Sequence, residues 1–161
     1  MPDLTLPTAQ YALVQSARAA LLDYCATLAP AAFTTALPGF GGSSIGSLLV
    51  HVANTYRHWL GIVGQQQAIE YYDPAEATNL AAVRQLFAEV DALATAYYTA
   101  AAPNWLDTQL LAVPGQPGPL ALSPLTLFTH VLTHEFHHKG QVLSMSRQLG
   151  YPPVDTDVIR F

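Results

Sequence analysis

The chain has 161 residues, enough for one domain with a full hydrophobic core, and 51% of them are hydrophobic. Only 11% are charged, and the formal net charge is -5, with no cluster of Lys or Arg that could hold a phosphate backbone. These totals argue against nucleic acid and anionic membrane surfaces as partners, and they predict a single domain over residues 1–161.

Cys25 is the single cysteine, which leaves no intrachain disulfide and no thiolate cage for zinc. The N-terminus lacks the basic start and apolar run of a secretory signal, and no later stretch approaches about 18 uninterrupted apolar residues. We therefore expect a soluble, cytoplasmic protein in which Cys25 is a buried packing residue. The low charge and high hydrophobic content also predict a homodimer, in which a second copy covers apolar surface.

Two helices are predicted in the first part of the chain. Apolar residues recur at spacings of three and four over residues 8–30, where Arg18 interrupts the apolar stripe. After a segment rich in glycine, Ser43 or Ser44 is placed to cap a second helix that ends near Gly64.

The second part of the chain predicts two more helices and a long loop between them. The third helix covers about residues 74–101, and its apolar period indicates scaffold. The segment 103–124 holds five prolines and is expected to be an ordered loop, with an extended piece at 108–113. The last helix covers residues 123–149, with a serine cap and a proline at its start and Gly150 after its end. The chain is thus predicted to be all-α, a four-helix bundle with a long proline-rich loop between helices 3 and 4.

The last predicted helix carries four of the six histidines of the chain, His130, His134, His137 and His138. Residues four apart on a helix share a face with their β-carbons about 6 Å apart, so two imidazoles can converge on one ion. On a helical wheel, His134 and His138 lie at the edge of the apolar arc, whereas the other two lie towards the polar side. The spacing predicts His134 and His138 as metal ligands; the alternative is a pair of rim histidines bonded to backbone or water.

A third ligand must come from another helix, where His51 and His58 are available. They are seven residues apart, about 10 Å along a helix axis, so they cannot hold one ion together. The wheel favours His51 only slightly. Three histidines with open positions for a guest are typical of a catalytic site, and three imidazoles suit zinc, nickel, copper and iron.

Glu135 points near the middle of the apolar arc of the last helix, where a carboxylate must be paired, protonated or bonded to a histidine. We interpret it as a residue that orients a ligand or as a catalytic acid or base; the alternative is a glutamate that faces an interface. The string HEFHH also has the His-Glu-x-x-His spacing of zinc proteases, but those enzymes need a further ligand downstream and no histidine follows His138.

Two segments, LLVHVANTYRHWL and LFTHVLTHEFHHKGQVLSMSRQLGYPP, resemble the DinB family, also described as DinB/YfiT-like metalloenzymes, and the resemblance covers nearly the whole chain in helix order. It implies a four-helix bundle, often dimeric, with a nickel, zinc or similar ion held by one histidine of the second helix and two of the fourth. Those positions match His51, His134 and His138.

Characterised members of that family are thiol transferases that use bacillithiol, mycothiol or glutathione, and others resemble metal-dependent hydrolases or maleylpyruvate isomerases. The resemblance therefore implies a metal-dependent enzyme, first of all a thiol S-transferase that acts on an electrophilic small molecule, with zinc or nickel as the ion. The alternatives are a metal-dependent hydrolase and a non-catalytic, stress-associated metal-binding dimer. Trp59 and Trp105 are candidate substrate-binding residues, with ordinary aromatic packing as the alternative for each.

Overall fold

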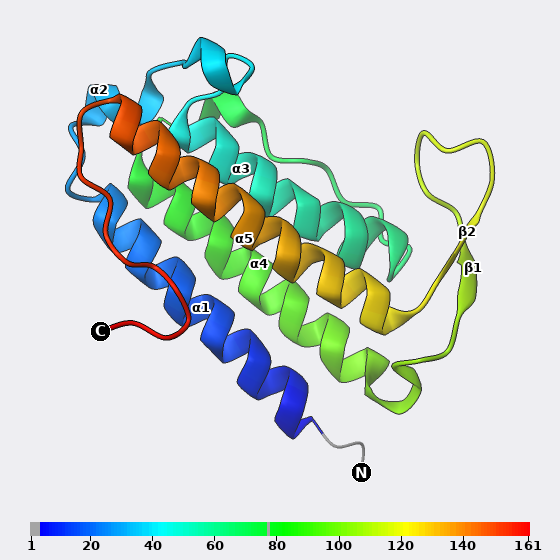
Figure 1. Cartoon of the computed structure of the whole chain (residues 1–161). Coiled ribbons are helices and arrows are strands. Elements are labelled where there is room, and N and C mark those ends of the chain that lie inside the picture. Colours follow the sequence, from blue (N-terminus) through cyan, green and yellow to red (C-terminus); the bar gives the residue numbers. More distant parts are fainter. Residues whose placement is uncertain (1–3, 77) are drawn as a thin grey trace.

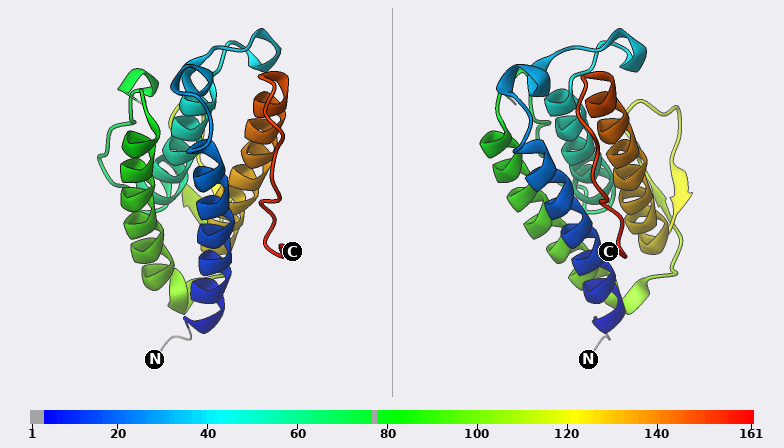
Figure 2. Two further views of the ribbon diagram at one scale, coloured as in Figure 1. Left: turned by 90° about the vertical axis from the view of Figure 1, so that its left-hand side faces the viewer. Right: turned by 60° about the vertical axis from the view of Figure 1, so that its left-hand side comes forward.

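The computed structural model describes residues 4–76 and 78–161, and it shows long helices packed side by side with a small hairpin at one end (Figure 1). This confirms the predicted helical bundle. The main helices are α1 (Thr5–Cys25), α3 (Ile45–Tyr56) with its π-helical continuation η2 (Arg57–Val63), α4 (Leu80–Ala101) and α5 (Pro124–Gln148). Helix α3 packs against both α4 and α5, and α1 covers α4 and α5 on another side (Figure 2).

Shorter elements connect these helices. They are α2 (Pro30–Thr34), the 3-10 turns η1 (Pro38–Phe40), η3 (Pro74–Glu76) and η4 (Ala102–Asn104), and the strands β1 (Gln109–Leu111) and β2 (Leu120–Leu122). The strands pair antiparallel, with Leu110 opposite Ala121. The extended piece expected within the proline-rich loop is thus confirmed as β1, and its partner strand β2 was not predicted.

Serine caps fix the starts of α3 and α5 where the sequence placed them. The side chain of Ser44 accepts a hydrogen bond from the backbone N–H of Ser47, whose hydroxyl in turn accepts from the N–H of Ser44. Ser123 accepts from the N–H of Thr126, and Pro124 occupies the first helical position. These caps satisfy N–H groups that have no partner within the helix.

The starts of α1 and α4 differ from the prediction. Helix α1 begins at Thr5 rather than at residue 8, because Pro7 fits within a first turn, where its missing N–H is not needed. Helix α4 begins at Leu80 rather than at residue 74, since Asn79 caps it by accepting from the N–H of Ala82. Residues 1–3 of the predicted domain and Ala77 of the predicted third helix lie outside the described residues.

The π-helical segment η2 approaches α4 closely at its end. A β-carbon at Gly64 would lie 2.6 Å from Cε2 of Tyr97, so only glycine lets η2 pack this closely on α4. Single π-helical turns within α-helices are frequent at functional sites. Here the segment carries His58 and Trp59, which follow His51 of α3 by about two helical turns.

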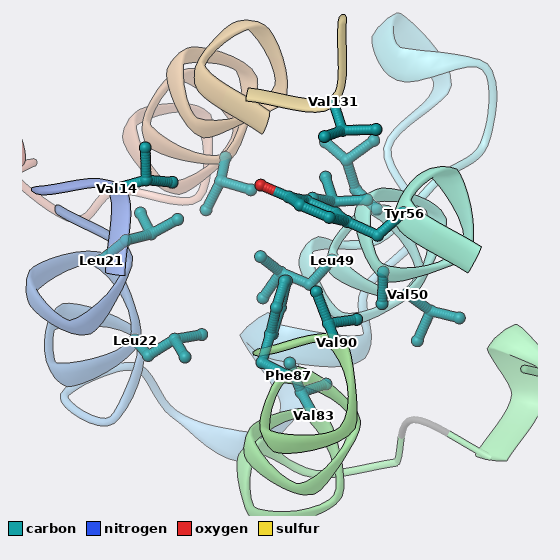
Figure 3. Packing of buried hydrophobic residues seen from close by; sticks show 14 of the residues in the cluster. Val14, Leu21, Leu22, Leu49, Val50, Tyr56, Val83, Phe87, Val90 and Val131 are labelled. Atoms are coloured by element: carbon teal, nitrogen blue, oxygen red, sulfur yellow. The ribbon is translucent and has the colours of Figure 1, made fainter. Parts of the chain in front are cut away.

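The hydrophobic core fills the space between the four main helices (Figure 3). Each of them contributes buried side chains, among them Val14, Leu49, Val90 and Val131. Cys25 belongs to this core, as predicted, and burial raises the pKa of its thiol to about 12.

A buried network of charges crosses the same core. Arg18 on α1 donates from Nε to Oε1 of Glu135 over 2.7 Å and from Nη2 to Oε2 over 2.9 Å. Its Nη1 donates to Oδ1 of Asp91 on α4 over 2.5 Å. Two tyrosine hydroxyls complete the network, that of Tyr56 on Glu135 and that of Tyr11 on Asp91. The network ties α1, α3, α4 and α5 together around one guanidinium.

The C-terminal segment after α5 runs back along α1 (Figure 2). The buried ammonium of Lys139 donates to the carbonyl oxygen of Thr156 over 2.6 Å. Near the end of the chain, Nη2 of Arg160 donates to Oγ of Ser16 on α1 over 2.6 Å. These bonds hold the segment on the face of the bundle formed by α1 and α5.

Candidate metal centre

Three histidines meet where α3 packs against α5. His134 and His138 are four residues apart on α5, and their ring centroids lie 4.4 Å apart. The ring of His51, on α3, lies 5.1 Å from that of His134 and 4.8 Å from that of His138. The structure thus brings together the three residues that the sequence and the family resemblance singled out.

The ring nitrogens of this histidine triad, His51, His134 and His138, are spaced for coordination. Nε2 of His134 lies 3.1 Å from Nε2 of His51, and one ligand atom from each residue falls within 4.8 Å of the others. Bonds of about 2.0–2.1 Å from ion to nitrogen place neighbouring ligand nitrogens about 3.0–3.4 Å apart. One pair already has this spacing, and the third ring is close enough to join it after a small shift.

Gln141 orients one of the three rings. Its Oε1 lies 2.6 Å from Nδ1 of His138, one helical turn back on α5. Because a carbonyl oxygen only accepts, Nδ1 of His138 must carry the proton, which leaves the lone pair on Nε2. Metal-binding histidines generally use the second ring nitrogen in this way.

The triad histidines are neutral near pH 7. Burial, together with the neighbouring imidazoles of His138 and His51, lowers the pKa of His134 to about 4. Burial likewise lowers the pKa of His51 and of His138. Neutral imidazoles are the form that binds a metal, so protons compete weakly for this site at neutral pH.

Two hollows open on either side of the triad. The first, here the aromatic hollow, has a volume of about 290 Å³ and is lined by Asn54, Thr55, His58, Trp59 and Tyr71 together with His51 and His134. The second, here the polar hollow, has a volume of about 510 Å³, and its lining includes Gly42, Ser43, Ser47 and Gln141 together with His51 and His138. Within the described residues, no Asp, Glu, Lys or Arg lines either one. The triad therefore has room for guests on two sides.

The model of the DinB family matches residues 1–161, the whole chain. The chain belongs to the DinB family. A comparison with curated protein sequences gives no significant match. Across the part of the chain that the structure describes, no helix combines the length and apolar character needed to cross a membrane.

This DinB protein thus carries a three-histidine group that could hold a metal ion. The remaining histidines stay outside the group. His130 and His137 are exposed on α5, as the helical wheel predicted, and Nδ1 of His58 is 2.7 Å from the hydroxyl of Tyr71. Of the two candidates for the third position, the structure places His51 in the group and His58 on the wall of the aromatic hollow.

Glu135 is not brought to the triad of this DinB protein. Its carboxylate is buried and accepts hydrogen bonds from Arg18 and Tyr56, so of the states considered for it, the paired one is present. Among the described residues, it is absent from the group whose ligand atoms cluster. A role as the acid or base of a reaction therefore stays a prediction, and the contacts of Glu135 are those of a structural residue.

The two candidate substrate-binding tryptophans lie in different places. Trp59 lines the aromatic hollow, and its ring contacts that of His130, with centroids 5.0 Å apart. Trp105 packs on Phe128, with ring centroids 5.5 Å apart, and lines a separate apolar hollow near the start of α1 that includes Leu6. The structure therefore brings only Trp59 to the triad.

Sequence reasoning missed two residues that shape the site. Gln141 could have been found from its spacing, because a polar side chain three residues after His138 lies on the same face of the helix. Tyr71 gave no such signal. It lies in an irregular segment, which Asn54 holds in place by bonding the backbone of Tyr72 through both amide atoms.

Proposed function

We propose that this DinB protein is a metal-dependent enzyme that transfers a low-molecular-weight thiol, such as bacillithiol, to an electrophilic small molecule. The supporting observation is the convergence of three neutral imidazoles beside two hollows that can each accept a guest. His51, His134 and His138 would hold zinc or nickel. When bound, such an ion lowers the pKa of a thiol and supplies a thiolate at neutral pH.

The residues that line the two hollows suit different substrates. In the polar hollow, Ser43 Oγ and the Nε2 of Gln141 have no hydrogen-bond partner among the described residues, so they are available to the polar body of a thiol. In the aromatic hollow, Trp59 offers a ring face to the electrophile. Because His51 lines both hollows, the two substrates would meet beside its ring.

The position of the triad supports a catalytic rather than a structural ion. His51 is exposed, and His134 and His138 are half-buried at the edge of the bundle, outside the core cluster. A protein whose core is complete without metal should stay folded when a chelator removes the ion. We expect metal-free protein to keep its helical circular dichroism spectrum and its cooperative unfolding. Loss of helix on chelation would favour a structural ion.

The test of the proposal is a thiol transfer assay with untagged protein loaded with zinc or nickel. Bacillithiol or glutathione is mixed with 1-chloro-2,4-dinitrobenzene, and the absorbance of the conjugate is followed. We expect the acceleration to be lost in His134→Ala and His138→Ala. The matched control is His137→Ala, which removes the exposed neighbour of His138 on the same helix and should keep the rate. No acceleration by any metal form, or full activity in His138→Ala, would contradict the proposal.

A homodimer is part of the same proposal. Several large apolar side chains are exposed on the single chain, among them Leu6 at 76%, Leu106 at 75% and Leu110 at 73%. Leu6 also lines one apolar hollow together with Leu125, which is 43% exposed, and a contiguous apolar patch is commonly covered by a partner. Multi-angle light scattering at micromolar concentration should give twice the mass of the chain, and a monomer mass would refute this part.

A further inference from the structure

The walls of the aromatic hollow are rings rather than hydrogen-bonding groups. Trp59 and His58 meet edge to face, with centroids 4.7 Å apart, and the ring of Tyr71 stacks on that of His58 at 6.2 Å with an interplanar angle of 23°. The volume of about 290 Å³ compares with about 150 Å³ for an engineered cavity that binds benzene. The hollow therefore has space for a substituted ring and flat surfaces to pack on it.

Most polar side chains of this hollow already have partners within the protein. Both amide atoms of Asn54 are bonded to the backbone of Tyr72, over 2.9 and 2.8 Å. The hydroxyl of Thr55 donates to the carbonyl oxygen of His51 over 3.0 Å. The hydroxyl of Tyr71 lies 2.7 Å from Nδ1 of His58. Both amide atoms of Asn54 and the hydroxyl proton of Thr55 are thus engaged within the protein, whereas the hydroxyl oxygens keep lone pairs that can accept from a ligand.

Among the described residues, four polar atoms of the lining side chains have no hydrogen-bond partner: the indole N–H of Trp59, Nε2 of His58, and Nδ1 of both His51 and His134. The indole N–H can only donate, so it suits a neutral acceptor such as a carbonyl or nitro oxygen. A ligand that combines a flat ring with one such acceptor could pack on the ring faces and accept the hydrogen bond of the indole N–H.

Charge narrows the class of ligand further. Within the described residues, the hollow has no Asp, Glu, Lys or Arg, and burial lowers the pKa of His58, so this ring is neutral near pH 7. In metal-free protein, a carboxylate would lose hydration here without a counter-charge, and it would face the negative faces of aromatic rings. A cation would be attracted by those faces but repelled by a divalent ion held at His51 and His134.

The geometry points to the aromatic hollow as a binding site for a planar, uncharged ring that carries a neutral hydrogen-bond acceptor. This inference rests on the proposed function in so far as the ring is the electrophilic substrate, because the hollow shares His51 and His134 with the triad. It names the class of electrophile: a neutral aromatic or conjugated ring compound, rather than a carboxylic acid or an ammonium compound.

The experiment compares three probes that share one ring, namely 4-nitrobenzamide, 4-nitrobenzoate and 4-nitrophenyltrimethylammonium. Isothermal titration calorimetry gives their affinities for metal-free and zinc-loaded protein. We expect the amide to bind at least tenfold more tightly than the anion in metal-free protein, and at least tenfold more tightly than the cation in zinc-loaded protein. Cyclohexanecarboxamide, which has the amide without a planar ring, should bind at least tenfold more weakly than 4-nitrobenzamide. Equal or tighter binding of either charged probe in the form of the protein named for it, or of the saturated amide, would overturn the inference.

The location is read from the two tryptophans, whose indole N–H signals are separate reporters in protein labelled with ¹⁵N-tryptophan. We expect 4-nitrobenzamide to shift the signal of Trp59 and to leave that of Trp105 in place, because Trp105 lies in a different hollow. Tyr71→Ala should weaken binding at least fivefold without unfolding the chain, since Tyr71 is 52% exposed. Leu106→Ala, at an exposed position outside the hollow, is the control and should leave binding unchanged. A shift of Trp105 alone, or unchanged binding in Tyr71→Ala, would refute the assignment.

The two proposals can fail separately. If metal-free protein binds 4-nitrobenzamide at Trp59 but no ion is taken up at the triad, the inference about the hollow stands and the proposed function fails. If thiol transfer depends on the triad while no neutral ring compound shifts the signal of Trp59, the proposed function stands and the inference fails.

Discussion

Replacing Arg18 with Met would test what the buried charges in the bundle core do. The Arg18 side chain is only 4% exposed and, among the described residues, is the single cation bonded to Glu135. Without it, this buried carboxylate keeps one hydrogen bond, from Tyr56. Removing one partner of a buried ion pair costs about 3–5 kcal/mol, because the other charge stays buried without compensation. We expect Arg18→Met to lower the free energy of unfolding by about that amount, measured by urea denaturation with far-UV circular dichroism.

A second arginine provides the matched control. Nη2 of Arg84 pairs with Oδ1 of Asp23 at 2.7 Å, the same distance as between Nε of Arg18 and Oε1 of Glu135. The side chains of this second pair are 41% and 73% exposed. Exposed pairs contribute about 0–1 kcal/mol, since water solvates both charges. Arg84→Met should therefore cost less than about 1 kcal/mol.

The double variant Arg18→Met/Glu135→Leu separates two causes of destabilisation, the loss of the Arg18–Glu135 ion pair and the burial of an unpaired Glu135 carboxylate. It removes both members of the buried pair, and Asp91 keeps its bond from Tyr11 and its partial exposure of 32%. We expect it to be less destabilised than Arg18→Met alone, because no unpaired carboxylate remains in the core. The reasoning would be refuted if the double variant lost as much free energy of unfolding as Arg18→Met and Glu135→Leu lose together. It would also be refuted if Arg18→Met lost no more than Arg84→Met.

Two further predictions concern the triad. Gln141→Leu removes the oxygen that accepts from Nδ1 of His138. We expect metal affinity, measured by competition with a chromogenic chelator, to fall about 10- to 100-fold. An unchanged affinity would show that the bond does not orient the ring. Acid should destabilise the metal-free protein between about pH 6.5 and pH 4. Burial lowers the pKa of His134 from 6.5 to about 4, so in this range His134 is protonated in the unfolded chain but not in the folded one. Urea titrations across this range should give a steeper loss for the natural protein than for His134→Gln, and identical slopes would count against the lowered pKa.

The helical frame could be predicted from the sequence because its signals are local. Ser123 and Pro124 at one end and Gly150 at the other bounded α5 to within a residue or two. The π-helical form of η2 could not be predicted. The close approach of Gly64, which follows η2, to Tyr97 of α4 was equally hidden, because a contact between distant parts of the chain leaves no periodic pattern.

The site was predictable to the extent that it lies on one helix face. His134 and His138 followed from their spacing, whereas the choice of His51 over His58 needed the family resemblance as well, since both lie on the same side of one helix. Arg18 and Glu135 each stood out as a charge on an apolar stripe. Only the packing of α1 on α5 shows that they bind each other, so the sequence suggested a functional role where the structure gives a structural contact.

The central claim, that three imidazoles hold one ion, is tested most directly by metal content. Untagged protein, dialysed after loading with zinc, should contain one ion per chain by elemental analysis. Each of His51→Ala, His134→Ala and His138→Ala should abolish this stoichiometric binding, while His58→Ala should retain it, because His58 lies outside the group. Full zinc content in His51→Ala, or its loss in His58→Ala, would contradict the account.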